Sequence, residues 1–240
     1  MITDKVAVVT GGSRGIGLAT ARTLLQRGAR VAITATSDTS LRAATEELDK
    51  ISGDSAVMAV RADVRRPEEV EQAFSSIAHR FGGIDVVVNN AGVGGFRAVA
   101  DMTIDEWRQI LDTNVSGVFH GCRAAVPHLR TRGGGWIINI SSLSSTNPFP
   151  EGAAYCASKA AVNAFTDAFM QEVRHDGIRV ACVLPGSVRT NFMGRSTSGS
   201  DDWKLAPEDV AQVVVDLIAH PARSLPSRVE IRPARPPRKR

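Results

Sequence analysis

The only tyrosine of the chain, Tyr155, precedes Lys159 by four residues, and this pair is the part of the sequence best suited to proton transfer. Four residues make about one helical turn, so on a helix the phenol and the ammonium group project from the same face. A tyrosine ionises near pH 10, and a positive charge beside it in a poorly solvated cleft stabilises the phenolate. We therefore expect Tyr155 to act as an acid and a base, with Lys159 lowering its pKa.

A glycine-rich turn near the amino terminus has the composition of a phosphate-binding loop. It reads TGGSRGIG from Thr10 to Gly17, between an apolar stretch and an amphipathic stretch that ends at Gln26. Glycines let the backbone approach a pyrophosphate, and the following helix terminus offers unpaired N–H groups. The first two functional glycines are separated by three residues, which departs from the common dinucleotide fingerprint. We expect a dinucleotide to contact Gly11, Ser13, Arg14, Gly15, Ile16 and Gly17.

The segment after the second apolar stretch predicts which dinucleotide binds. NAD-binding sheets place an acidic residue near the end of this strand, where it holds the ribose 2′-hydroxyl. Here the segment reads VAITATS from Val31 to Ser37, and no carboxylate precedes Asp38. The guanidinium of Arg14 would instead pair with a 2′-phosphate, and Thr36 and Ser37 supply hydroxyl donors. The prediction is NADP(H).

Further polar or small residues end the later apolar stretches. Asn89-Asn90-Ala91-Gly92 ends the fourth, Ser141-Ser142 the fifth and Pro185-Gly186 the sixth, and Asn114 lies between the fourth and the fifth. Each is weak alone, because loop asparagines and serines usually cap turns. Together with Tyr155 and Lys159 they form a candidate site.

Seven short β-branched stretches alternate with amphipathic stretches, and this alternation predicts the fold class. The expected strands are Lys5–Thr10, Arg30–Ala35, Ala56–Arg61, Ile84–Asn89, Trp136–Ser141, Ile178–Leu184 and Arg228–Arg232, and helices are expected to begin near Gly15, Thr39, Pro67, Thr103, Ala153 and Pro207. Nearly continuous apolar strands alternating with helices predict an α/β, Rossmann-like, doubly wound domain: a seven-stranded parallel sheet with helices on both faces. In such folds ligands bind outside the carboxyl ends of the strands.

Length and composition favour one enzyme-sized domain. The chain has 240 residues, of which 43% are hydrophobic, and we expect one domain over residues 1–232 and a basic, proline-rich tail over residues 233–240. Three dispersed cysteines suit a reducing cytosol and argue against a metal site, and no stretch is apolar enough to span a membrane. We expect a cytoplasmic protein. The net charge of +4 is modest and lies largely in the tail, so nucleic-acid binding is disfavoured.

The ordered set of motifs resembles the short-chain dehydrogenase/reductase family from Lys5 to about Arg232. It comprises the glycine turn, Asp63-Val64, the run from Asn89 to Gly92, Asn114, Ser142, the Tyr155 to Lys159 run, and Pro185-Gly186 with Thr190 following. The pattern is most similar to NADPH-dependent 3-oxoacyl-carrier-protein reductases. The segment before Pro207 is shorter than theirs, and the ending from Val229 to Pro233 is similar to that of members acting on small hydroxy acids and related alcohols.

The resemblance implies a hydride transfer between a nicotinamide and a carbonyl or secondary alcohol substrate. Tyr155 would be the acid/base, Lys159 would also hold the nicotinamide ribose, Ser142 would bind the substrate oxygen, and Asn114 would hold a water that links Lys159 to solvent. The further cofactor contacts implied are Asp63 and Val64 for the adenine, Asn90, Ala91 and Gly92 for the adenosine ribose and nicotinamide side, and Val188 and Thr190 for the carboxamide. Pro185 and Gly186 are also implied cofactor contacts.

Assembly and substrate are open at this point. Small side chains on the helix from Ala153 to Val173 indicate close packing, and in the family this helix usually contributes to a homodimer or homotetramer. The substrate pocket is expected among Gly94–Val99, Leu143–Pro150 and Ser187–Trp203, where Arg97 or Arg195 could meet a carboxylate. Two alternatives are a catalytically silent NADP-binding regulator with the same fold and nucleic-acid association through the tail.

Overall fold

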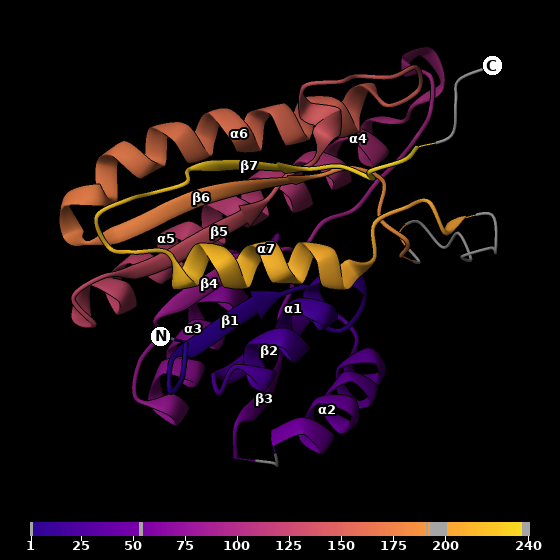
Figure 1. Cartoon of the computed structure of the whole chain (residues 1–240). Coiled ribbons are helices and arrows are strands. Elements are labelled where there is room, and N and C mark those ends of the chain that lie inside the picture. The colour runs from indigo at the N-terminus through magenta and orange to yellow at the C-terminus, as the bar shows by residue number, and fades with distance from the viewer. Residues whose placement is uncertain (1, 53–54, 191, 193–200, 237–240) are drawn as a thin grey trace.

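The apolar stretches pair as one seven-stranded parallel sheet in the computed structural model, which describes residues 2–52, 55–190, 192 and 201–236 (Figure 1). The strands are β1 (Val6–Thr10), β2 (Arg30–Ala35), β3 (Val57–Arg61), β4 (Val86–Asn89), β5 (Gly135–Ile140), β6 (Ile178–Pro185) and β7 (Arg228–Ile231). Their order across the sheet is β3-β2-β1-β4-β5-β6-β7, and every pairing is parallel.

In the described residues seven α-helices connect the strands. They are α1 (Gly15–Gln26), α2 (Asp38–Ser52), α3 (Pro67–Phe81), α4 (Ile104–Leu111), α5 (Gly117–Thr131), α6 (Ala153–Val173) and α7 (Pro207–Ala219). Local sequence explains several of their ends. Pro67 stands in the first turn of α3, and Gly82 ends that helix with φ +81°, a left-handed conformation that favours glycine. Thr103 caps α4 in a reciprocal capping box with Glu106.

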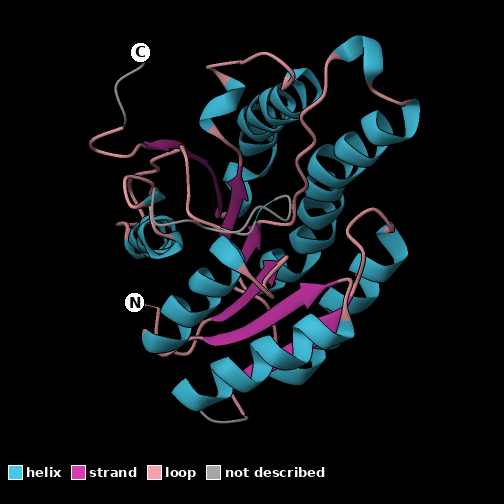
Figure 2. Ribbon diagram, turned by 90° about the vertical axis from the view of Figure 1, so that its right-hand side faces the viewer, coloured by secondary structure: helices cyan, strands magenta, loops and turns pink. Residues whose placement is uncertain are grey.

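Two apolar cores cover the two faces of the sheet. On one face α1, α2 and α7 bury residues such as Leu24, Leu48 and Val214 against the strands (Figure 1). On the other face α3, α5 and α6 bury residues such as Phe74 and Leu129. Figure 2 shows the twisted sheet between these helices. Because both faces are covered, the strands are apolar on both sides, which explains their continuous hydrophobic runs.

The doubly wound architecture is confirmed. The chain winds outward from β1 to β3, crosses back to β4 beside β1, and then winds to β7, so the strand order reverses between β1 and β4. A crevice forms at such a reversal, outside the carboxyl ends of the strands. The segments that follow the strands are therefore the ones brought together.

The stretch beginning near Thr103 differs from a single helix. The α4 helix passes through one π-helical turn, Asp112–Ser116, before α5 begins. A π-turn inserts an extra residue, widens the helix locally, and is common at functional sites. The spacing of apolar residues along the whole stretch does not reveal such an extra residue.

Two further findings concern the chain as a whole. No helix in the described parts of the chain is long and apolar enough to cross a bilayer. The start of the tail continues directly from β7, while residues 237–240 of the expected tail lie outside the described residues.

Candidate active site

A cleft of about 1300 Å³ opens at the carboxyl ends of the strands. It exceeds the roughly 300–1000 Å³ typical of drug-sized ligand pockets, so it has room for a dinucleotide together with a substrate. All but two of the expected site residues line it: Gly11, Ser13, Arg14, Gly15, Ile16, Thr36, Ser37, Asp63, Val64, Asn90, Ala91, Gly92, Ser142, Tyr155, Lys159, Pro185, Gly186, Val188 and Thr190. The exceptions are Gly17 and Asn114, which are buried and do not line the cleft.

Tyr155 and Lys159 face one another across the first turns of α6. The Lys159 Nζ lies 5.9 Å from the centroid of the Tyr155 ring, and it donates a hydrogen bond to the carbonyl of Ile140 at 2.9 Å. Lys159 is only 5% exposed, whereas Tyr155 is partly exposed toward the cleft. The expected shared face of the helix is therefore present.

The pKa of Tyr155 moves in the direction opposite to our expectation. Burial raises the pKa of the phenol, and a hydrogen bond with Ser142 opposes this only in part. Burial also lowers the pKa of Lys159 from 10.5 to about 8. Lys159 is then largely neutral at the high pH where the phenol ionises, so its charge does not offset the burial. The expectation that Lys159 lowers the pKa of the Tyr155 phenol toward 7 is wrong for the protein without cofactor.

Ser142 is held in place by the short turn that follows β5. Its Oγ accepts a hydrogen bond from the Ser144 N–H at 3.1 Å, and its carbonyl accepts one from the Ser145 hydroxyl at 2.6 Å. Asn163 on α6 donates to the Ser145 hydroxyl at 2.8 Å. The turn that carries Ser142 is thus tied to the helix that carries Tyr155 and Lys159.

Asn114 projects from the π-helical turn and is completely buried. Its amide exchanges two hydrogen bonds with the backbone of Val93, at 2.8 and 2.9 Å, and donates to the Ser158 hydroxyl at 3.0 Å. Ser158 in turn donates to the Tyr155 carbonyl at 2.7 Å. The side chain therefore joins the loop after β4 to α6, and its polar atoms are already engaged by protein groups.

The glycine turn has the geometry of an anion cradle. Gly11 and Gly15 have φ of +62° and +55°, where a side chain would be strained. Helix α1 has no side-chain cap on its first N–H groups and no acidic residue in its first turn. These donors and the helix dipole suit the pyrophosphate of a dinucleotide.

Gly17, expected as a cofactor contact, does not line the cleft, and its lack of a side chain has a packing role. A Cβ at this position would lie 2.4 Å from the Gly11 carbonyl oxygen and 2.5 Å from the Asn90 amide nitrogen. The absence of a side chain lets α1 pack closely against the turn, and Asn90 fixes that turn by donating to the carbonyls of Thr10 and Gly11 at 2.9 and 3.1 Å. Spacing alone does not separate a contact glycine from a packing glycine.

Hydroxyl groups gather where the glycine turn and the segment after β2 line the cleft. Ser13, Thr36 and Ser37 line the cleft together with Ser40, whose hydroxyl lies 3.2 Å from that of Ser13. Ser40 was missed by the sequence reasoning, although its place in the first turn of α2 was the available signal. No acidic residue from the end of β2 faces this part of the described cleft wall.

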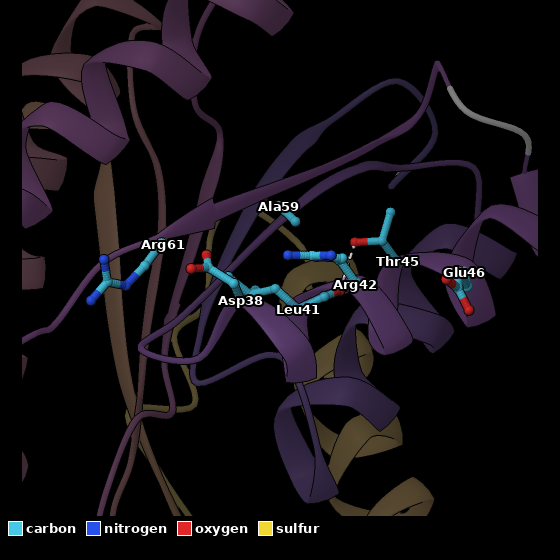
Figure 3. A pocket seen from close by; sticks show the side chains of 7 residues that line it. All are labelled: Asp38, Leu41, Arg42, Thr45, Glu46, Ala59 and Arg61. Atoms are coloured by element: carbon cyan, nitrogen blue, oxygen red, sulfur yellow. Dashed lines mark hydrogen bonds between the residues drawn. The ribbon is translucent and has the colours of Figure 1, made fainter.

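Asp38, the first acidic residue after β2, faces elsewhere. It lines a separate, open depression of about 360 Å³ between α2 and β3, with Leu41, Arg42, Thr45, Glu46, Ala59 and Arg61 (Figure 3). This depression contains none of the expected site residues. Asp38 does not line the main cleft.

The side chain of Asp63 is engaged by an arginine. Arg65 forms hydrogen bonds with both carboxylate oxygens of Asp63, including one of 2.5 Å, and this pairing lowers the pKa of Asp63. Arg65 also lines the cleft, and the sequence reasoning missed it. The sequence signal for Arg65 was the carboxylate of Asp63, two residues earlier in the same loop. The carboxylate positions Arg65 at the expected adenine end.

Of the two arginines considered for a substrate carboxylate, only Arg97 lies among the described residues, and it does not fill that role. Arg97 forms an ion pair with Glu106 at 2.9 Å and does not line the cleft. Arg195 lies outside the described residues. The tail forms part of the cleft wall. Pro233 and Pro236 line the cleft, and a Cβ on Gly186 would lie 3.0 Å from Pro233.

Metal ligands and reactive thiols do not assemble among the described residues. No group of three His, Cys, Asp or Glu side chains there could hold a metal ion. All three cysteines are buried, and burial raises the pKa of Cys122 to about 12 and that of Cys182 to about 11. A buried thiol with a raised pKa is a poor nucleophile.

Comparison with known proteins identifies the family. A family model described as short chain dehydrogenase matches residues 5–201. An uncharacterized oxidoreductase of Staphylococcus aureus strain MW2 is 33% identical over 233 residues, which cover 97% of this chain and 99% of the relative.

Solved structures agree. The alcohol dehydrogenase of Thermococcus sibiricus, complexed with 5-hydroxy-NADP, superposes with a TM-score of 0.88 at 31% identity, covering 98% of this chain and 99% of that one. A metagenomic short-chain oxidoreductase in complex with NADP gives a TM-score of 0.84 at 35% identity, with the same coverage.

Proposed function

The chain belongs to the short-chain dehydrogenase family of oxidoreductases, and from that premise we propose that it is an NADP(H)-dependent enzyme that interconverts a carbonyl compound and a secondary alcohol. The observation that carries the proposal is the convergence of Ser142, Tyr155 and Lys159 on one wall of a cleft whose other end is an anion cradle. Each of the three is fixed by backbone or side-chain hydrogen bonds, which is the preorganisation that catalysis requires.

The residues of the cleft divide the chemistry between them. Bound NADPH supplies a hydride, that is two electrons and a proton, to the carbonyl carbon. Tyr155 donates its phenolic proton to the carbonyl oxygen, which becomes the alcohol, and recovers a proton from solvent. Ser142 hydrogen-bonds the same oxygen and stabilises the negative charge that develops on it. Lys159 lies beside the phenol, near the expected place of the nicotinamide ribose.

The raised pKa of Tyr155 suits this direction of reaction. A general acid must hold its proton at the working pH until the substrate oxygen needs it. Burial keeps the phenol protonated near neutrality. Oxidation of an alcohol would require the phenolate, and therefore additional positive charge beside the ring.

The choice of NADP(H) is supported by the adenosine end of the cleft. Arg14 and the hydroxyls of Ser13, Ser37 and Ser40 lie there, and Asp38 faces a different depression. The Arg14 side chain is exposed and forms no ion pair with a described residue, so its charge is available. Two of the similar solved structures contain NADP or a derivative of it.

We also propose a homodimer or homotetramer that uses α5 and α6. Ala157, Ala160 and Ala164 are exposed along one face of α6, at spacings of three and four residues. Phe119 on α5 is 46% exposed and contacts Phe165 edge to face, at 6.3 Å between ring centroids. Small residues beside exposed aromatics allow a second copy to pack closely.

The substitution Tyr155→Phe tests the proton-transfer role. It removes one hydroxyl and little volume, so the ring contacts remain and the free energy of NADPH binding should change little. We expect kcat to fall at least about 100-fold, the lower end for general acid catalysis. The measurement is NADPH oxidation with a reducible ketone, alongside NADPH binding by fluorescence. Retention of more than about a tenth of the rate would contradict the role. A wild-type chain that binds NADPH and reduces no carbonyl compound would support the catalytically silent alternative.

The substitution Arg14→Ala tests the cofactor choice. It removes a charge-assisted contact to the 2′-phosphate, so the ratio of kcat/KM for NADPH to that for NADH should fall at least about tenfold. Arg42→Ala is the matched control, because Arg42 lines only the depression between α2 and β3. Equal use of the two cofactors by the wild type, or an unchanged ratio in Arg14→Ala, would refute NADP(H) preference.

Sedimentation velocity at micromolar concentration tests the assembly. We expect a dimer or tetramer for the wild type and dissociation for Ala160→Glu, which places a charge on the exposed face of α6. Ser76→Glu, a matched addition of charge on the exposed surface of α3, should leave the assembly unchanged. A strictly monomeric wild type would reject the proposal.

A further inference from the structure

Aromatic side chains surround the catalytic tyrosine. The Phe96 ring meets the Tyr155 ring edge to face, at 5.9 Å between centroids, and Phe149 meets Phe96 in the same way at 5.1 Å. The Phe192 ring also contacts Tyr155, at 6.0 Å between centroids. All four rings line the cleft. Phe149 and Phe192 remain 38% and 37% exposed, so these rings present apolar surface that no described residue covers.

The backbone holds this aromatic wall, formed by Phe96, Phe149, Tyr155 and Phe192, in a defined arrangement on its Phe96–Phe149 side. The Arg97 N–H donates to the Glu151 carbonyl at 2.8 Å, which joins the loop after β4 to the loop before α6. A Cβ on Gly152 would lie 2.5 Å from the Phe149 ring. The glycine therefore lets Phe149 fold back toward Phe96, and the edge-to-face pair is built into the loops.

Two basic side chains of the described cleft wall are paired with carboxylates. Lys204, which lines the cleft, pairs with Asp201 at 2.7 Å, and Arg232 pairs with Glu230 at 2.6 Å. The remaining basic residues of the described cleft wall are Lys159, at the catalytic centre, and Arg14 and Arg65, at the adenosine end. Apart from Lys159, which the proposed function assigns to the nicotinamide ribose, no described basic residue beside the aromatic wall is left unpaired to compensate for the desolvation of a substrate carboxylate.

Building on the proposed function, we infer that the substrate is an uncharged carbonyl compound with an aromatic ring attached next to the reacting carbon. Its ring would pack against Phe96 and Phe149 while the carbonyl oxygen meets Tyr155 and Ser142. Edge-to-face and offset contacts favour an aryl group over an alkyl group of similar area. The same surroundings disfavour small keto acids.

Four ketones that differ only in ring and charge test the inference: pyruvate, ethyl pyruvate, benzoylformate and ethyl benzoylformate. The wild type is assayed with each at saturating NADPH. We expect ethyl benzoylformate to have the highest kcat/KM. We then compare ratios of kcat/KM for two ketones between protein variants. The intrinsic reactivity of each ketone cancels in this comparison, because it is the same for every variant.

Two substitutions address the ring. In Phe149→Ala the ratio of kcat/KM for ethyl benzoylformate to that for ethyl pyruvate should fall at least about tenfold, as expected for a lost apolar contact of ring size. In Phe149→Leu, which keeps apolar volume, the ratio should fall about threefold, because only the aromatic geometry is lost. Ile51→Ala, which shortens an exposed apolar side chain on α2 outside the cleft lining, is the matched control and should keep the wild-type ratio. NADPH binding by every variant verifies that the cleft is folded.

One substitution addresses the charge. Asp201→Asn leaves Lys204 without its paired carboxylate, so the ratio of kcat/KM for benzoylformate to that for its ethyl ester should rise about threefold. A wild type that already prefers the two acids would overturn the inference of an uncharged substrate.

The outcomes separate this inference from the proposed function. If ethyl pyruvate is reduced and Tyr155→Phe abolishes its reduction, the proposed function stands. If in that case Phe149→Ala changes the aryl-to-alkyl ratio less than about threefold, well below the loss expected for a ring contact, the inferred substrate class is wrong. A fall of the ratio in Phe149→Ala with no change in Ile51→Ala supports it.

Discussion

The site depends on the burial of a phenol and an ammonium group side by side. Burial favours the neutral form of each, so it raises the pKa of Tyr155 and lowers that of Lys159 to about 8. The phenol keeps its proton near neutrality, while Lys159 still carries much of its charge there. This state is suited to donating a proton to a carbonyl oxygen. Positive charge brought by an oxidised nicotinamide would be needed to make the phenolate accessible for the reverse reaction.

The sheet makes this burial possible by bringing distant segments to one edge. Ser142 follows β5 and Tyr155 begins the helix before β6, and Asn163 and Ser145 connect the two. Asn114 reaches the same helix from a π-turn and hydrogen-bonds Ser158. The catalytic groups are therefore positioned by hydrogen bonds between elements that are far apart along the chain but adjacent at the reversal of strand order. A loop built only from local contacts would not fix them so closely.

Much of the fold could be predicted from the sequence because its signals are local. Continuous apolar strands, a proline or a capping residue at helix starts, and a glycine turn between strand and helix each report on a few neighbouring residues. Three features depended on tertiary structure. Desolvation of Tyr155 reversed the predicted shift of its pKa, Gly17 proved to be a packing position, and the pairing of Arg97 with Glu106 removed a candidate carboxylate partner. The aromatic wall around Tyr155 likewise joins loops some fifty residues apart, which no local pattern shows.

The most direct test is a spectrophotometric titration of the phenol, which is unambiguous because the chain has a single tyrosine. The absorbance of the phenolate is followed against pH in the cofactor-free protein and with saturating NADP⁺. The account predicts that the phenol ionises above its ordinary pKa of about 10 in the free protein, and that it ionises at a lower pH once NADP⁺ places its positively charged nicotinamide ring beside the phenol. Ionisation at or below pH 10 without cofactor, or an identical titration in both states, would contradict it.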